Sequence, residues 1–136
     1  MFGFANKIAF DRTFDEPGRG FHLGINRYKH NAEGISPDLQ LSMNLISETE
    51  GSGDHFTVQA LYGARYYFKT HSEGHKRIFV SALLGPAFRN ESGDDFIDNR
   101  LDIGYSAGAY LELSKVVLGL SMDAPASLVF KIGLTF

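Results

Sequence analysis

Residues that could form a hydrolytic site are scattered along the chain. A serine nucleophile needs a histidine base within hydrogen-bond distance and an acid that orients the base. The candidates for such a set are Ser42, His22, His55 and Glu112. No short spacing links a nucleophile to a base, so we interpret both histidines as hydrogen-bonded polar residues and predict no catalytic residue.

Two polar segments could offer ligands to a metal ion. The acidic run 91–98 has carboxylate oxygens suited to Ca²⁺ or Mg²⁺, but it lacks the ligand spacing of an EF-hand. His71 and His75 are four residues apart in a turn-like segment, so they do not share a helix face. Cysteine is absent, which removes thiolate ligands and nucleophiles. We therefore predict no metal site and no cofactor.

Alternating apolar residues predict the elements that position these side chains. Period-two alternation is typical of a strand with two different faces. The expected strands are about 3–11, 19–29, 37–46, 55–68, 77–89, 100–113, 116–123 and 128–136. Pro86 predicts a bulge or a weakly paired point, 91–99 predicts a polar loop, and Ser114-Lys115 predicts a two-residue hairpin connection. Together they form one domain over 1–136, an eight-stranded antiparallel up-and-down β-barrel.

Side-chain volume indicates which face of this barrel points inward. The apolar face carries far more bulk than the narrow interior of an eight-stranded barrel can hold. The opposite face is rich in glycine, serine and asparagine, which suits a crowded lumen. We therefore predict a transmembrane barrel with lipid outside and a polar lumen. The alternative is a soluble up-and-down barrel that binds an apolar small molecule inside.

Charged residues on the inward face must be paired if they are buried. The predicted luminal charge network consists of Lys7, Asp38, Arg65, Arg89, Asp102, Glu112 and Lys131. A channel or pocket is the alternative interpretation, but a salt-bridged plug fits a narrow lumen better. Aromatic residues near the ends of the apolar face predict two interfacial girdles, formed by Phe4, Phe10, Phe21, Phe56, Tyr66, Phe68 and Phe88.

Composition excludes several other classes of protein. The net charge is −3 with no basic stripe, so no nucleic-acid partner is expected. No apolar run approaches the roughly 18 residues of a transmembrane helix. The segment 1–7 has no feature of a secretory signal peptide, so an exported protein would here be a mature domain with an added Met.

The last strand resembles the C-terminal signal by which outer-membrane barrels are recognised by the barrel-assembly machinery. Its signal residues are Phe130, Ile132, Leu134 and Phe136, which alternate and end on an aromatic residue. With the segment 61–68 and the glycine-rich strands, the whole chain resembles small outer-membrane β-barrels of Gram-negative bacteria, including the Bacteroidota type. This resemblance implies a location in the outer membrane and contact with membrane lipids and lipopolysaccharide.

The resemblance leaves the molecular activity open, because such families contain anchors, adhesins, assembly accessories and a few lipid-modifying enzymes. We expect a non-enzymatic barrel with a closed polar lumen that acts as a structural anchor or surface-interaction module. A third possibility is a lipid A-modifying enzyme, for which the outer-membrane lipid A deacylase, with its lipid-facing Ser–His–acid arrangement, is the precedent.

Overall fold

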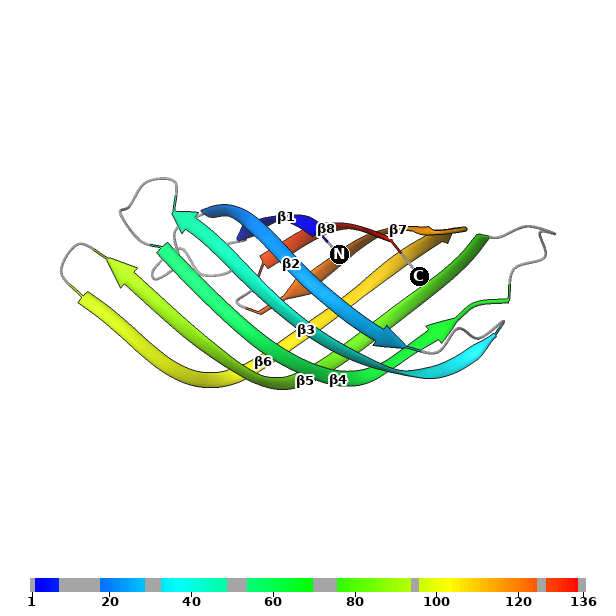
Figure 1. The fold of residues 1–136 in the computed structure, drawn as a ribbon, viewed down its shortest axis with the longest axis horizontal. Coiled ribbons are helices and arrows are strands. Elements are labelled where there is room, and N and C mark those ends of the chain that lie inside the picture. Colours follow the sequence, from blue (N-terminus) through cyan, green and yellow to red (C-terminus); the bar gives the residue numbers. More distant parts are fainter. Residues whose placement is uncertain are drawn as a thin grey trace.

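The computed structural model describes residues 2–7, 18–28, 33–48, 54–69, 76–93, 96–124 and 127–134. Within them the strands are β1 (Phe2–Lys7), β2 (Gly18–Tyr28), β3 (Gly34–Glu48), β4 (Asp54–Tyr67), β5 (Lys76–Gly93), β6 (Phe96–Leu113), β7 (Val116–Asp123) and β8 (Ser127–Leu134). Each strand pairs antiparallel with the next along the chain, and β1 pairs with β8. The prediction of an all-β, antiparallel up-and-down barrel is confirmed (Figure 1).

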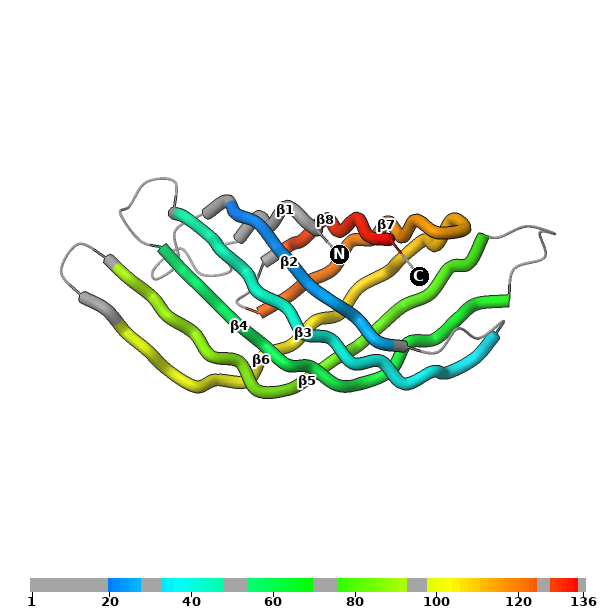
Figure 2. The backbone as a smooth tube through the Cα atoms, in the orientation of Figure 1, coloured from blue at the N-terminus to red at the C-terminus, as the bar shows by residue number. Residues whose placement is uncertain are grey.

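The barrel wall is taller on one side than on the other. Strands β3 to β6 have 14 to 18 residues, whereas β7 and β8 have eight each. The long strands curve round one side of the molecule, and β5 and β6 extend past β7 at the left of the view (Figures 1 and 2). The prediction of a polar loop over 91–99 is therefore wrong for most of that segment, because β5 continues to Gly93 and β6 begins at Phe96. Its residues continue the hairpin, with Asn90 opposite Asn99 and Glu91 opposite Asp98.

The ladder between β4 and β5 is interrupted opposite Pro86. Gln59 pairs with Ala87 and Tyr62 with Leu84, but the two positions between them are not paired. Proline has no N–H to donate to the ladder. The register is the same on both sides of the gap, so Pro86 produces the weakly paired point that the sequence predicts, without a bulge.

A small aromatic core fills the lumen near the end of the barrel where Ser114-Lys115 joins β6 to β7, the short-turn end. The ring of Phe79 stacks on Tyr110 with centroids 4.9 Å apart, and Tyr67 lies 5.2 Å from Phe79. Gly119 provides the space for this stack, because a Cβ there would lie 2.1 Å from the Tyr110 ring.

Gly119→Val is therefore expected to destabilise the barrel. The Tyr110 ring would have to leave its stack on Phe79, and such overpacking typically costs about 1–3 kcal/mol. Urea unfolding of the detergent-folded protein measures the loss. Leu118→Val, on the outer side of the same strand, is the control, and an equal loss in both variants would contradict the role of the stack.

Candidate functional site: a polar lumen inside an apolar wall

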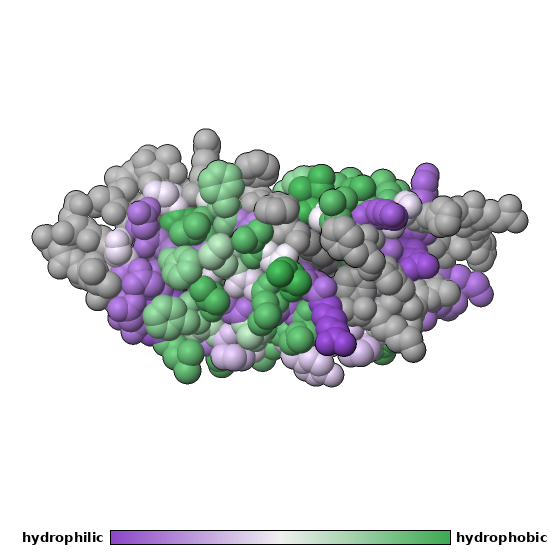
Figure 3. All heavy atoms as spheres, in the orientation of Figure 1, coloured by the Kyte–Doolittle hydropathy of each residue, from purple (hydrophilic) through white to green (hydrophobic). Residues whose placement is uncertain are grey.

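The two faces of the wall differ in polarity. On the outer face the hydrophobic residues of the visible wall gather between hydrophilic groups nearer its two ends (Figure 3). Exposed apolar side chains include Phe21, Ile25, Leu41, Leu84, Leu101 and Phe130. Buried side chains of the inner face are mostly polar or charged. A soluble barrel with an apolar ligand inside needs the reverse arrangement, so this alternative loses its support.

Asp123 is the centre of the main luminal cluster. Its carboxylate accepts hydrogen bonds from the hydroxyls of Ser106 at 2.7 Å and Ser121 at 2.9 Å. The ammonium of Lys131 lies 2.8 Å from Asp123 Oδ2 and 3.0 Å from Oδ1. Both charged side chains are completely buried. Strands β6, β7 and β8 are thereby tied together by one charge-assisted network.

His22 joins this cluster from β2. Its Nδ1 atom lies 2.6 Å from Asn44 Oδ1 and 3.4 Å from Asp123 Oδ2. Asn44 in turn donates to the backbone carbonyl of Ala124. The other ring nitrogen has no hydrogen-bond partner among the described residues and points toward Gly24, where a Cβ would lie 2.9 Å away. The cluster thus connects β2 and β3 with β7 and β8 across the lumen.

A second ion pair lies nearer the short-turn end. Arg65 donates from Nε and Nη2 to Asp38 Oδ2, at 3.0 and 2.6 Å. Its Nη1 donates to the hydroxyl of Tyr67 at 3.3 Å, and the guanidinium carbon lies 4.5 Å from the centre of the Phe79 ring. The buried arginine is therefore both charge-paired and stacked.

A chain of amide and hydroxyl groups lies between the two ion pairs. Asn26 donates to Gln40 and to Asp38. Gln40 and Gln59 both donate to the hydroxyl of Ser42, at 3.0 and 3.1 Å. These contacts fill the middle of the lumen with bonded polar groups, which is the arrangement expected of a plug.

Four of the predicted luminal charges are buried on the inner face. Asp38, Arg65 and Lys131 are fully buried in ion pairs. Glu112 is buried near the short-turn end, with Arg77 3.7 Å away.

The remaining predicted charges lie elsewhere. Arg89 is half-buried, and Asp102 is exposed instead of buried in the lumen. Asp102 lies at the tall rim, the end of the barrel where β5 and β6 extend past β7. The side chain of Lys7 lies outside the described residues. Lys131 pairs with Asp123, which the alternation of the sequence also places on the inward face.

The hydrolytic candidates do not form a lipid-facing set. Ser42, His22 and Glu112 all lie on the luminal face, and Ser42 is occupied by two glutamine amides. His55 lies at the tall rim, 3.5 Å from Glu91. Sequence spacing could not show whether these residues meet one another, because strand pairing decides which inward residues come together.

The tall rim carries a mixed-charge network on its inner side. Arg100 lies 3.2 Å from Glu91 and 4.0 Å from both Asp98 and Asp102. Arg89 lies 3.4 Å from Asp102 and 3.7 Å from Glu91. Acidic and basic side chains alternate here, so the rim is not a uniformly acidic surface.

The predicted aromatic and signal residues lie on the outer wall where their side chains are described. Phe21, Tyr66, Phe68, Phe88, Phe130, Ile132 and Leu134 are exposed, and Phe56 is half-exposed. The side chains of Phe4, Phe10 and Phe136 lie outside the described residues. Tyr66 and Phe68 form an edge-to-face pair near the short-turn end.

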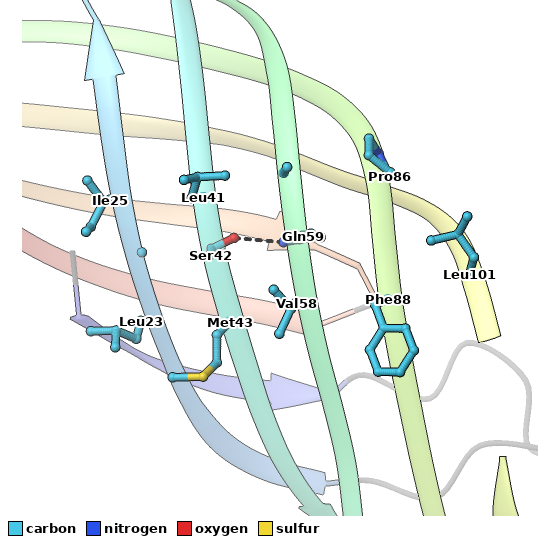
Figure 4. Close-up of a pocket in the computed structure, with 12 residues that line it drawn as sticks. Leu23, Ile25, Leu41, Ser42, Met43, Val58, Gln59, Pro86, Phe88 and Leu101 are labelled. Carbon is cyan, nitrogen blue, oxygen red and sulfur yellow. Dashed lines mark hydrogen bonds between the residues drawn. The ribbon is translucent and has the colours of Figure 1, made fainter. Parts of the chain in front are cut away.

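A shallow apolar groove of about 520 Å³ crosses the outer wall over β2 to β6 (Figure 4). Its lining includes the small or flat side chains of Ala60 and Pro86 together with Leu41, Val58 and Phe88. The groove lies beside the interrupted β4–β5 pairing. It presents carbon almost throughout, so its surface suits a hydrocarbon chain.

The described residues contain no group of three His, Asp or Glu side chains able to hold a metal ion. No helix among them is long and apolar enough to cross a membrane.

Solved structures that share this architecture include two outer-membrane proteins. The outer membrane enzyme PagL has a TM-score of 0.66 and 14% identity, covering 99% of this chain and 98% of PagL. Ail, the attachment invasion locus protein of Yersinia pestis, has a TM-score of 0.63 and 16% identity, covering 99% and 95%. The chain has the fold of these outer-membrane barrels. No protein-family model and no curated protein sequence matches it.

The likeness to PagL corrects the prediction that this chain is not an enzyme. That prediction treated the small barrel as an anchor, whereas an outer membrane enzyme has the same fold over nearly its whole length. A fold can carry unrelated functions, so the barrel itself gives no ground for excluding catalysis.

Proposed function

We propose that this chain is an integral β-barrel of the bacterial outer membrane that anchors a surface-interaction module. The observation that carries this proposal is the polarity of the wall, with exposed apolar side chains outside and buried ion pairs inside. A barrel in water buries its apolar face, whereas a barrel in lipid exposes it. The folds of PagL and Ail add support at the level of architecture.

The two ends of the barrel support one orientation. The β6–β7 connection is only Ser114-Lys115, whereas β5 and β6 project well past β7 at the opposite end. Outer-membrane barrels have short periplasmic turns and longer extracellular connections. We place the projecting β5–β6 hairpin on the cell surface, where it forms the interaction module.

The membrane partners follow from the outer wall. Membrane lipids and lipopolysaccharide would contact the apolar belt, including the groove over Ala60 and Pro86. The barrel-assembly machinery would read the alternating residues of β8, which are exposed at Phe130, Ile132 and Leu134. The packed lumen supports an anchor in preference to a pore.

Gel migration and solubility test the proposal. The purified protein should require detergent, and unboiled samples should migrate separately from boiled ones because the paired barrel resists detergent until heated. Cell fractions should contain the protein in the outer membrane. A monomer that stays soluble in plain buffer and shows no heat-dependent migration would refute the membrane location.

A further inference from the structure

One basic side chain lies on the outer wall among apolar ones. Arg27 of β2 is exposed, and it follows Leu23 and Ile25 on the outward face of that strand, which are exposed as well. Across the ladder it lies opposite Leu39, another exposed apolar residue. Among the described residues, no ion pair or side-chain hydrogen bond involves Arg27. Because arginine stays protonated in proteins, the wall carries a permanent positive charge on its lipid side at this position.

Arg27 lies close to the end of the wall where such a charge is tolerated. It is next to last in β2, which ends at Tyr28 on the short-turn side. The edge-to-face pair of Tyr66 and Phe68 lies on the outer wall at the same end, as is typical of aromatic residues at a membrane interface. Long basic side chains near the ends of membrane-spanning segments bend toward the headgroups. We therefore expect the Arg27 guanidinium at headgroup level.

The protein groups near Arg27 in the chain do not supply an anion for it. Glu33, the nearest acid along the sequence, lies 3.9 Å from the ammonium of Lys69. The intervening residues 29–32 include a lysine and a histidine but no acid. A guanidinium binds phosphate through two parallel N–H donors, so a phosphate-bearing partner is complementary to this basic position.

The apolar groove begins beside Arg27. Ile25, the preceding outward residue of β2, lines the groove, and Leu41 lies opposite Ile25 across the ladder and lines it too (Figure 4). From β2 the groove crosses to β6, which is four strand spacings of about 4.8 Å and therefore roughly 19 Å. The hydrocarbon of one leaflet is about 15 Å thick, half of the bilayer core. The groove is thus long enough for one acyl chain of a lipid whose phosphate lies at Arg27.

We propose that Arg27 and the groove form a binding site for one phospholipid molecule. Its phosphate lies on the Arg27 guanidinium, and one acyl chain lies along Ile25 and Leu41 into the groove. This inference rests on the proposed function and names the lipid that the wall selects. In the proposed orientation the short-turn end faces the periplasm, and the periplasmic leaflet of an outer membrane consists of phospholipid. Lipopolysaccharide lies in the opposite leaflet, so it is not the occupant.

Lipid binding to the detergent-folded protein tests the phosphate position. In a maltoside detergent, which carries no phosphate, phosphatidylglycerol is titrated and the bound lipid is measured by native mass spectrometry. Arg27→Gln should raise the dissociation constant roughly tenfold, because it removes a charge-assisted hydrogen bond to the phosphate. Arg27→Lys should keep part of the affinity, because it retains the charge without the two parallel donors. An unchanged dissociation constant in Arg27→Gln would overturn the proposal.

Lys69→Gln is the matched control for charge. It removes an exposed cation that already lies beside Glu33, so phosphatidylglycerol should bind this variant as it binds the natural protein. Equal losses in Lys69→Gln and Arg27→Gln would mean a general effect of net charge and would contradict the site. Diacylglycerol, which has no phosphate, should not distinguish Arg27→Gln from the natural protein. Lipid A that displaces phosphatidylglycerol more strongly than added phospholipid does would reassign the site to lipopolysaccharide.

Filling the groove tests the position of the acyl chain. Ala60→Phe places a ring in the lining of the groove and should weaken phosphatidylglycerol binding severalfold. Ala109→Phe, the same substitution at an exposed position of β6 outside the groove, should leave binding unchanged. Equal affinities of the two variants would show that the chain lies elsewhere.

Heat-dependent gel migration of every variant monitors the barrel separately. If the natural protein lacks this migration or stays soluble without detergent, the proposed function has failed. If a folded barrel binds phosphatidylglycerol equally well with and without Arg27, only the phospholipid site has failed.

Discussion

Asp123→Leu should lower the free energy of unfolding by about 3–5 kcal/mol, because it leaves Lys131 charged, buried and without its carboxylate. The hydroxyls of Ser106 and Ser121 lose their acceptor in the same variant. The chain has no tryptophan, so unfolding in urea is best followed by circular dichroism and by the fraction of unboiled, folded protein on gels.

The double variant Asp123→Leu with Lys131→Met distinguishes the effect of the unpaired charge from the effect of changed packing. Replacing both members of a buried pair by apolar residues of similar volume is often nearly neutral. We expect the double variant to regain most of the stability lost in the single one. If the single and double variants lose the same free energy of unfolding, the loss comes from packing and not from the unpaired ammonium.

Leu41→Arg should destabilise the barrel in a bilayer by about 2–4 kcal/mol, because it places a cation on the lipid face near the middle of the wall. Leu41 is exposed on the outer side and lies halfway along β3. Refolding into phospholipid vesicles at graded urea concentrations measures the cost.

Ile35→Arg is the matched control for depth. Ile35 lies on the same face of the same strand, near its beginning at the short-turn end. Near the interface an arginine costs only about 0–1 kcal/mol. Equal costs at both positions, or a negligible cost at Leu41, would mean that the wall is not embedded in lipid as proposed.

The strands and the direction of their faces could be predicted from the sequence because alternation is a local property. The segment 116–123 is a strand as predicted, and Lys131 is buried on the luminal side. The projecting hairpin could not be predicted. Its polar residues have the composition of a loop, and only the partner strand shows that Asn90 bonds to Asn99 across a ladder.

For the candidate site, the sequence likewise predicts which residues face inward but not which of them pair. Inward spacing identified Asp38 and Arg65, but nothing local indicates that they meet each other, or that Lys131 meets Asp123 instead of Asp102 or Glu112. These pairings depend on the register between strands that are distant in sequence. His22 shows the same dependence, since its partners Asn44 and Asp123 come from β3 and β7.

Residue alternation and side-chain volume are enough to predict a barrel with one apolar and one polar face, because neither requires knowledge of strand pairing. Only the folded structure shows which luminal charges neutralise each other and how far β5 and β6 extend past β7. Each of these depends on the register between strands, and the register is a property of the closed sheet and not of any one segment.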